Sequence, residues 1–264
     1  MAAGEDTRPV AVERRGSLAV LRLARPAQRN ALSVDLIEAL CAALAELESD
    51  PGVTAAVLAG AGRSFSAGGD LGDIAARVGG GEEILARVDL MRGLQRGITA
   101  LRGSRLPVVA AVHRHVYGAG WSLALACDAI VAAADTVFCQ VFVKRDLVPD
   151  LGSAWLLTRA VGSLRARELM LTGAEVDAAR ALELGLVNRV ADSAEGALEA
   201  AVELAAAMAQ SSPATVGMTK SLIAAAEETT LEQALTLETH AQSLALGSPA
   251  SRAAIAAFRE SRSA

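Results

Sequence analysis

Aromatic side chains are scarce in this chain of 264 residues: Phe, Trp and Tyr together supply 3% of it, although 52% of the residues are hydrophobic. The apolar content is therefore mainly aliphatic, and alanine, valine and leucine supply most of it. Because disorder requires low hydrophobicity and high net charge, we expect the chain to fold around a substantial core. Small side chains predict that helices and strands pack with their backbones close together.

Basic residues are outnumbered, since 25 Lys and Arg face 30 Asp and Glu, for a formal net charge of -5. A chain with this balance has no basic excess for the release of counterions, so nucleic acid is not an expected partner. Cysteine is also sparse. Cys41, Cys127 and Cys139 lack the spacing of zinc ligands, so we expect free thiols and no metal site.

Long uncharged hydrophobic runs are missing. The longest apolar stretch, residues 106–134, is interrupted by His113, Arg114, His115 and Asp128, whereas a membrane span needs about 20 apolar residues with few charges. The first ten residues contain Glu5, Asp6 and Arg8 and no apolar region of a secretory signal. We therefore expect a cytoplasmic protein with no membrane contact.

Strands and helices are predicted to alternate through the first two thirds of the chain. A stripe of leucines and Ile37 predicts a helix over Ser33–Glu48 with Ser33 as its N-cap. A second long helix is expected over residues 82–101, after a flexible joint at residues 79–81, and a short one is expected to end near Cys127. Strands are predicted at Pro9–Val12, Leu18–Leu23, Val53–Ala59, Pro107–Val112 and Asp128–Ala133.

The pattern becomes almost wholly helical from Ser153 onward, with breaks at glycine and proline. Alternation followed by a helical end predicts the α/β class. We divide the chain into a core at residues 1–200 and a C-terminal helical region at residues 201–264.

Two glycine-containing turns follow predicted buried strands. The first is residues 65–71, Phe-Ser-Ala-Gly-Gly-Asp-Leu, and the second is residues 118–122, Gly-Ala-Gly-Trp-Ser. Small residues at a strand end let a ligand approach backbone N–H groups, and two such turns can direct two N–H groups at one oxygen, as in an oxyanion hole. Tight turns without a ligand remain the alternative on this pattern alone.

These turns belong to a longer series of motifs. Residues 25–32 read Arg-Pro-Ala-Gln-Arg-Asn-Ala-Leu, residues 57–71 contain the first turn, and residues 118–128 contain the second. With the tail segments 212–220 and 257–262, the series resembles the enoyl-CoA hydratase/isomerase (crotonase) family over almost the whole chain. The resemblance implies a spiral of repeated β-β-α units whose C-terminal helical region forms trimers, often paired into hexamers.

The resemblance also implies an acyl-CoA thioester as substrate, with coenzyme A as part of that substrate and no separate cofactor. Its carbonyl oxygen would accept hydrogen bonds from the N–H groups of Gly69 and Ala119. Each well-placed donor of this kind is typically worth about 2.7 to 4 kcal/mol in the transition state. Contacts to the substrate, including the CoA of a neighbouring subunit for the last two residues, are expected at Arg29, Ala31, Ala67, Asp70, Leu71, Phe142, Lys220 and Phe258.

The chain departs from the family at two positions. Hydratases of the family use two glutamates, and the matching positions here hold Ser122 and Phe142. A hydroxyl and a phenyl ring are poor groups for activating water and protonating the α-carbon near neutral pH. Ordinary hydratase chemistry is therefore disfavoured, and Ser122→Ala is expected to matter little.

Asp150 offers a different carboxylate. Family members that isomerise double bonds or ring epoxides carry an acid/base carboxylate in this region, and Leu147–Gly162 resembles the epoxide isomerase type. Phe142 nearby would exclude water and raise the pKa of Asp150. The alternatives are that Asp150 caps the following helix, that it is a nucleophile as in halobenzoyl-CoA dehalogenases of the family, or that Asp146 is the base.

The sequence thus predicts double-bond isomerisation through a thioester enolate. Three other functions remain open: a hydratase with atypical residues, a protein that binds acyl-CoA without turnover, and a serine hydrolase. The last is suggested because Ser122, Asp150 and His240 follow the chain order of the α/β-hydrolase triad. His113 and His115 are more typical of a structural role, with lining of the acyl pocket as the alternative.

Overall fold

The computed structural model describes residues 8–78 and 84–262. Its centre is a six-stranded sheet in the order β1-β2-β3-β4-β6-β9, in which β1 is antiparallel to β2 and the remaining pairs are parallel. The strands of this sheet are β1 (Val10–Arg15), β2 (Leu18–Leu23), β3 (Ala55–Gly60), β4 (Val108–Val112), β6 (Ala129–Ala133) and β9 (Arg189–Ala191). A second, three-stranded sheet contains β5 (His115–Tyr117), β7 (Val137–Cys139) and β8 (Glu175–Asp177).

Helices and short 3-10 turns connect the strands. They are η1 (Pro26–Gln28), α1 (Val34–Ser49), α2 (Leu71–Val78), α3 (Ile84–Gly103), α4 (Ala119–Leu125), η2 (Val141–Arg145), α5 (Ser153–Val161), α6 (Ser163–Thr172), α7 (Ala178–Glu183), α8 (Ala194–Met208), α9 (Pro213–Ala226), α10 (Leu231–Leu246) and α11 (Pro249–Ser261). Helix α1 begins as predicted, because Ser33 Oγ accepts a hydrogen bond from the N–H of Leu36 at 3.2 Å. The expected glycine joint at residues 79–81 lies outside the described residues.

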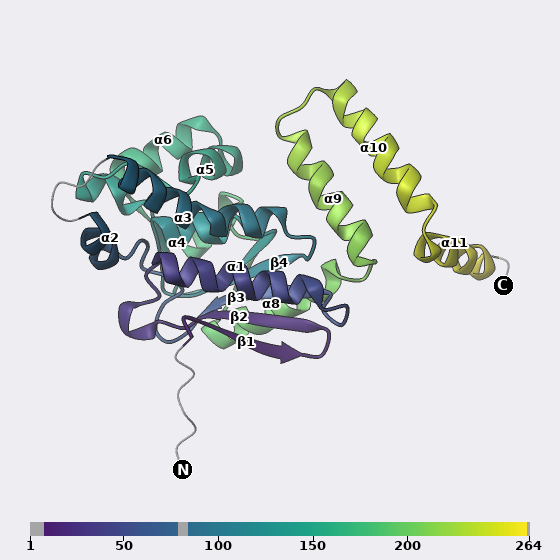
Figure 1. Cartoon of the computed structure of the whole chain (residues 1–264), viewed down its shortest axis with the longest axis horizontal. Coiled ribbons are helices and arrows are strands. Elements are labelled where there is room, and N and C mark those ends of the chain that lie inside the picture. Colours follow the sequence, from purple (N-terminus) through teal and green to yellow (C-terminus); the bar gives the residue numbers. More distant parts are fainter. Residues whose placement is uncertain (1–7, 79–83, 263–264) are drawn as a thin grey trace, which may run out of the picture.

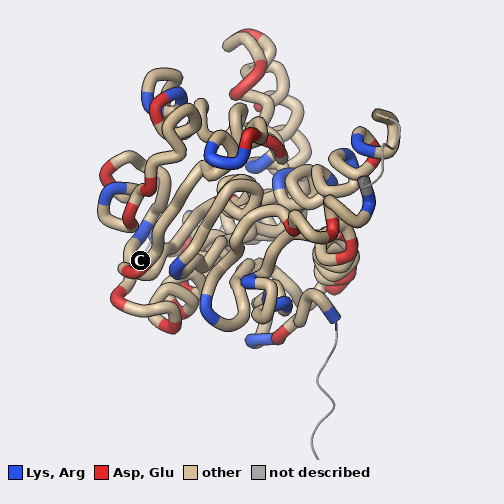
Figure 2. The backbone as a smooth tube through the Cα atoms, turned by 90° about the vertical axis from the view of Figure 1, so that its left-hand side faces the viewer, with Lys and Arg blue, Asp and Glu red and all other residues tan. Residues whose placement is uncertain are grey.

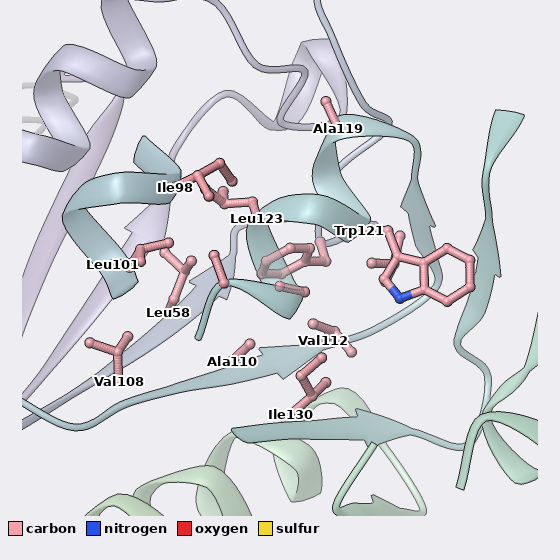
Figure 3. Close-up of a cluster of buried hydrophobic side chains, with 14 of the residues drawn as sticks. Leu58, Ile98, Leu101, Val108, Ala110, Val112, Ala119, Trp121, Leu123 and Ile130 are labelled. Atoms are coloured by element: carbon pink, nitrogen blue, oxygen red, sulfur yellow. The ribbon is translucent and has the colours of Figure 1, made fainter. Parts of the chain in front are cut away.

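Both faces of the central sheet are covered, as the alternation of side chains along β3 shows. Ala56 and Leu58 point into the main core beneath α1, α3 and α4, whereas Ala55, Val57 and Ala59 pack on the opposite face against α8. Figure 3 shows part of the main core, to which α4 contributes Trp121 and Leu123, with Leu123 beside Ile98 of α3, and the sheet contributes Val112 and Ile130. The face against α8 is built largely from alanine, so close packing of small residues is observed where the composition led us to expect it.

The C-terminal helices α9, α10 and α11 extend away from this core as an arm (Figure 1). Helix α8 runs through the position where the sequence suggested a division, between residues 200 and 201, and its Ala201 and Ala205 are buried on the sheet. None of the described helices is long and apolar enough to cross a membrane. Acidic and basic residues are interspersed over the view in Figure 2.

Candidate active site

The first glycine turn follows β3 and passes directly beside the second. Gly68 has a φ of +100°, and a Cβ atom built on it would lie 2.9 Å from the carbonyl oxygen of Tyr117, which precedes the second turn. The residues on either side of Gly69 pair with Leu32: Leu32 N–H donates to Gly68 O at 2.8 Å, and Asp70 N–H donates to Leu32 O at 2.9 Å. This pairing turns the N–H of Gly69 away from Leu32.

The second turn connects β5 to α4. Gly118 has φ +49° and ψ -120° and donates its N–H to the carbonyl oxygen of Cys139 at 2.8 Å. Helix α4 begins at Ala119, and Gly120 packs so tightly on the first turn that an added Cβ would lie 2.7 Å from both Cβ and Oγ of Ser66. The two turns are therefore fixed against each other by glycine contacts that a larger residue would disturb.

Both expected oxyanion donors are available for a ligand. Within residues 8–78 and 84–262, neither the N–H of Gly69 nor that of Ala119 donates a hydrogen bond. The Cβ position on Gly68 lies 3.8 Å from the nitrogen of Ala119, which places the second donor next to the first turn. Figure 3 shows Ala119 at the start of α4, and its side chain is buried. Two N–H groups without acceptors on adjacent turns are the arrangement from which an oxyanion hole is built.

A buried asparagine holds the first turn in place, and its role was not predicted from the sequence. Asn30 is fully buried, and its Nδ2 donates to the carbonyl oxygens of Ala61 and Ser64, both at 2.8 Å. Its Oδ1 accepts from the N–H of Arg25 at 2.9 Å. The backbone of Asn30 has φ +53°, and Asn is among the few residues enriched in this left-handed region. The tolerance of Asn for a left-handed backbone was the signal by which position 30 could have been singled out in the sequence.

Asp150 lies in the loop between η2 and α5. Its Oδ1 is buried and has no hydrogen-bond partner. Burial raises the pKa of Asp150 to about 6, against a smaller lowering from a hydrogen bond to its own backbone. The capping alternative is wrong, because Gly152 is the N-cap of α5 and no side chain caps this helix. The carboxyl group is thus poised to exchange a proton near neutral pH.

Ser122 and Phe142, the residues at the family's glutamate positions, are both buried. The Oγ of Ser122 lies 2.5 Å from the Oγ of Ser153 and 3.4 Å from the backbone oxygen of Asp150. The Phe142 ring covers the second turn, since its Cζ would be 3.4 Å from a Cβ on Gly118. An apolar ring and a hydroxyl engaged with another serine therefore border the second turn.

Several of the residues expected to contact the CoA bound in their own subunit lie in or beside the first turn. Arg29 is exposed, and its carbonyl oxygen accepts from the N–H of Ala67 at 3.0 Å. Leu71 is the first residue of α2 and is 42% exposed. Ala31 is half-buried in the loop before α1, where its carbonyl oxygen accepts from Nη1 of Arg25 at 2.8 Å.

Asp70 has a structural partner that the sequence did not reveal. Its carboxylate lies 2.9 Å from Nη1 of Arg25 and accepts hydrogen bonds from the N–H groups of Gly72 and Asp73, both at 3.1 Å. Burial alone would raise the pKa of Asp70, but these hydrogen bonds outweigh it and the pKa is lowered. Asp70 thus holds the start of α2 and the loop of Arg25 together.

Lys220 and Phe258 do not lie near the two turns of their own chain. The Nζ of Lys220 donates to Leu106 O at 2.8 Å and pairs with Asp128 at 2.7 Å, at the amino ends of β4 and β6. The turns follow the opposite ends of the parallel strands. Phe258 is 60% exposed on α11, in the arm. Contact of these residues with the CoA of a neighbouring subunit stays a prediction.

A cavity of about 620 Å³ lies between α9 and the core, on the side of Lys220. Trp155 and Leu156 form part of its wall, and Arg102 and Arg159 place their guanidinium groups 4.6 and 3.7 Å from the Trp155 ring centroid. Neither oxyanion turn lines this cavity, so its volume does not describe the acyl site.

His113 and His115 contact the loop that leads to the first turn. His113 Nε2 lies 3.1 Å from the carbonyl oxygen of Gly62, and His115 Nδ1 lies 3.1 Å from Oγ of Ser64. These contacts favour the structural role for both rings. Asp146 is exposed at the end of η2 with φ +52°, whereas Oδ1 of Asp150 is buried.

The serine hydrolase alternative is contradicted. Ser122 is buried in α4, whereas His240 is exposed on α10 in the arm. The hydroxyl of Ser122 contacts Ser153, Gly118 O and Asp150 O, and it contacts no histidine. The chain order that suggested a triad does not assemble one.

Comparison with known proteins identifies relatives across almost the whole chain. The family model described as enoyl-CoA hydratase/isomerase matches residues 13–264. The chain is 30% identical to the short-chain-enoyl-CoA hydratase of Clostridium acetobutylicum, over 96% of this chain and 95% of that protein. It is 35% identical to the 1,2-epoxyphenylacetyl-CoA isomerase of Escherichia coli, over 92% of each. The crystal structure of an enoyl-CoA hydratase from Polaromonas superposes with a TM-score of 0.90 at 35% identity, covering 96% of this chain and 97% of the other.

Proposed function

Since the chain belongs to the enoyl-CoA hydratase/isomerase family, we propose that it moves a double bond in an acyl-CoA thioester, with Asp150 as the acid/base. The observation that carries this proposal is the buried Oδ1 of Asp150, which has no hydrogen-bond partner. The backbone oxygen of the same residue lies 3.4 Å from Oγ of Ser122. Ser122 stands three residues after Ala119 on α4, so the carboxyl group belongs to the same corner of the molecule as the oxyanion donors.

In the proposed reaction the N–H groups of Gly69 and Ala119 donate to the thioester oxygen. Asp150 removes a proton from C2, and the electron pair of that C–H bond delocalises onto the oxygen as a dienolate. The proton then returns to C4, so the 3,4 double bond is lost and a 2,3 double bond forms. One carboxylate suffices, because the same group accepts and returns the proton. A pKa of about 6 leaves Asp150 ionised at neutral pH and its conjugate acid still able to donate.

Two observations favour isomerisation over hydration. Phe142 is buried against Gly118 where the family's hydratases hold a glutamate, and a phenyl ring excludes the water that hydration consumes. The isomerase of Escherichia coli is among the relatives at 35% identity. The hydratase names of most relatives keep hydration as the second candidate, and binding without turnover is the third.

The deciding experiment is mass spectrometry of acyl-CoA substrates in deuterated water. We expect 3-enoyl-CoA to become 2-enoyl-CoA, resolved from its substrate by chromatography, with deuterium in those turnovers in which the Asp150 proton exchanges with solvent. Asp150→Asn should abolish both while CoA thioester binding persists. Asp146→Asn, an exposed carboxylate four residues earlier, is the matched control and should keep activity. A 3-hydroxyacyl product, heavier by one water, would identify a hydratase instead. Binding with neither a shifted double bond nor deuterium exchange on any 3-enoyl or dienoyl substrate would leave only the binding role.

We further propose that the protein is cytoplasmic and forms a homotrimer or homohexamer through its C-terminal arm. Large apolar side chains of α9, α10 and α11 are more than half exposed in the single chain, among them Ile223, Leu231, Leu235, Leu244 and Phe258, and association would bury them. Light scattering of the purified protein tests the assembly. A monomeric mass would leave Lys220 and Phe258 without the neighbouring CoA that their predicted role requires.

A further inference from the structure

Two buried serines meet behind the loop that carries Asp150. Ser122 and Ser153 are both fully buried, and their Oγ atoms lie 2.5 Å apart. Each also reaches the same backbone oxygen: the N–H of Ser153 donates to Asp150 O at 2.9 Å, and Oγ of Ser122 lies 3.4 Å from it. The main chain of Asp150 is thus bound at one point from two helices, α4 and α5.

The turn that follows Asp150 needs such support. Leu151 has φ +47°, a left-handed conformation that is uncommon for a bulky residue, and Gly152 continues it at +74°. Strained backbone of this kind persists only where its surroundings determine it. The N-cap of α5 is Gly152, which has no side chain to cap the helix, and the contacts that hold the turn include the buried Leu151 side chain, 1% exposed, and the two serines.

The serine pair also joins the two halves of the proposed site. Ser122 lies on α4, which begins with the oxyanion donor Ala119, and Ser153 is the first residue of α5, directly after the turn of Asp150. We propose that the hydrogen bond between Ser122 and Ser153 is a positioning device that sets the carboxyl group of Asp150 relative to the N–H of Ala119. The inference rests on the proposed function, because it gives Ser122 and Ser153 an effect on rate only through Asp150.

This role revises the expectation that Ser122→Ala matters little. A base that is displaced from its proton reacts more slowly, and a misplacement of about 1 Å can cost roughly 100-fold in rate. The expected CoA contacts at Arg29, Ala67 and Leu71 lie beside the other turn. Loss of the serine bond should therefore lower kcat and leave KM nearly unchanged.

The test compares Ser122→Ala, Ser153→Ala and the double variant with Ser104→Ala. Ser104 is a matched control, since it is buried and hydrogen-bonded, with its Oγ 2.7 Å from Glu48 Oε1, outside both turns. We expect each single variant to lose about 10-fold to 100-fold in kcat with KM within about twofold. The double variant should lose no more than the worse single one, because both remove one interaction. The midpoint of the acidic limb of the pH profile should shift in all three.

Ser153→Thr keeps a hydroxyl and should restore most of the rate, which separates positioning from a general loss of packing. Thermal melts identify any variant that fails to fold, and the threonine variant then carries the comparison. Wild-type kcat and an unshifted pH midpoint in folded alanine variants, with Asp150→Asn inactive, would overturn the positioning role alone. An active Asp150→Asn would instead overturn the proposed function and remove the base that the serines are inferred to position.

Discussion

Nδ2 of Asn30 donates to the backbone oxygen of Ser64 at 2.8 Å, and this bond joins two loops that are 34 residues apart in the chain. The same amide nitrogen binds the carbonyl oxygen of Ala61, and Oδ1 accepts from Arg25 N–H. Truncation leaves these buried groups without partners. We therefore expect Asn30→Ala to lower the free energy of unfolding by about 2 to 4 kcal/mol, measured by chemical denaturation.

Asn30→Asp is a sharper test of the two hydrogen bonds that the Asn30 amide donates. A carboxylate of the same shape would face two carbonyl oxygens with no proton to donate, so it should be at least as destabilising as alanine at neutral pH. Gln28→Ala, at an exposed position in η1, serves as the control and should be nearly neutral. An Asp variant as stable as the wild type would show that the amide donors do not hold the loops.

Gly120→Ala tests the contact between the two turns. The new Cβ would lie 2.7 Å from Cβ and Oγ of Ser66 and 3.1 Å from its backbone oxygen, so the turns must separate. We expect a loss of about 1 to 3 kcal/mol in stability. We also expect slower α-proton exchange, because Ser66 lies three residues before Gly69 in the same turn. Gly103→Ala, at the exposed end of α3 with nothing within 4 Å of its Cβ position, should change neither.

The pH dependence of exchange follows from the raised pKa of Asp150, about 6. The carboxylate is the base, so the rate should fall about tenfold for each unit of pH below 6 and level off above it. Exchange rates of the bound thioester between pH 4.5 and 8.5 measure this limb. Asp146→Asn should leave the midpoint in place. A rate that is independent of pH through this range would exclude a carboxyl group with this pKa as the base.

The sequence predicted those parts of the fold whose signal is local. The stripe of α1 with its Ser33 cap, the buried strands β3 and β4, and both glycine turns each have a pattern within a few neighbouring residues, and the structure contains them. The short strands β5, β7, β8 and β9 were missed. Each has only three residues, which is too few for alternation to show.

The site was predictable only in part for a related reason. Gly69, Ala119 and Asp150 could be named because a series of motifs resembles a family. Asn30, Arg25 and Ser153 could not, because each acts through a tertiary contact: Arg25 with Asp70, Asn30 with Ser64, and Ser153 with Ser122. Residue type and spacing along the chain carry no information on such pairs, which exist only once the loops are folded against each other.

Asp150→Asn should stabilise the protein above pH 6 while it removes activity. Because the native pKa, about 6, exceeds the unfolded value of about 3.9, the folded state binds the proton more tightly. Wild-type stability therefore falls as the pH rises from about 4 to 6 and is then constant in this respect. A difference of two pKa units corresponds to roughly 3 kcal/mol. Since the loop is only partly buried, we expect Asp150→Asn to raise the free energy of unfolding by about 1 to 2 kcal/mol at pH 8, measured by denaturation.

The gain of Asp150→Asn should shrink toward zero near pH 4, where the wild-type carboxyl group is itself neutral. Asp146→Asn, on an exposed residue of the same loop, is the control and should show no such pH-dependent difference. A variant at position 150 that is less stable than the wild type at pH 8 would mean that the ionised carboxylate makes a favourable contact in the folded protein. The ionised carboxylate would then stabilise the folded protein, whereas the raised pKa of Asp150 implies that ionisation of this base lowers the free energy of unfolding.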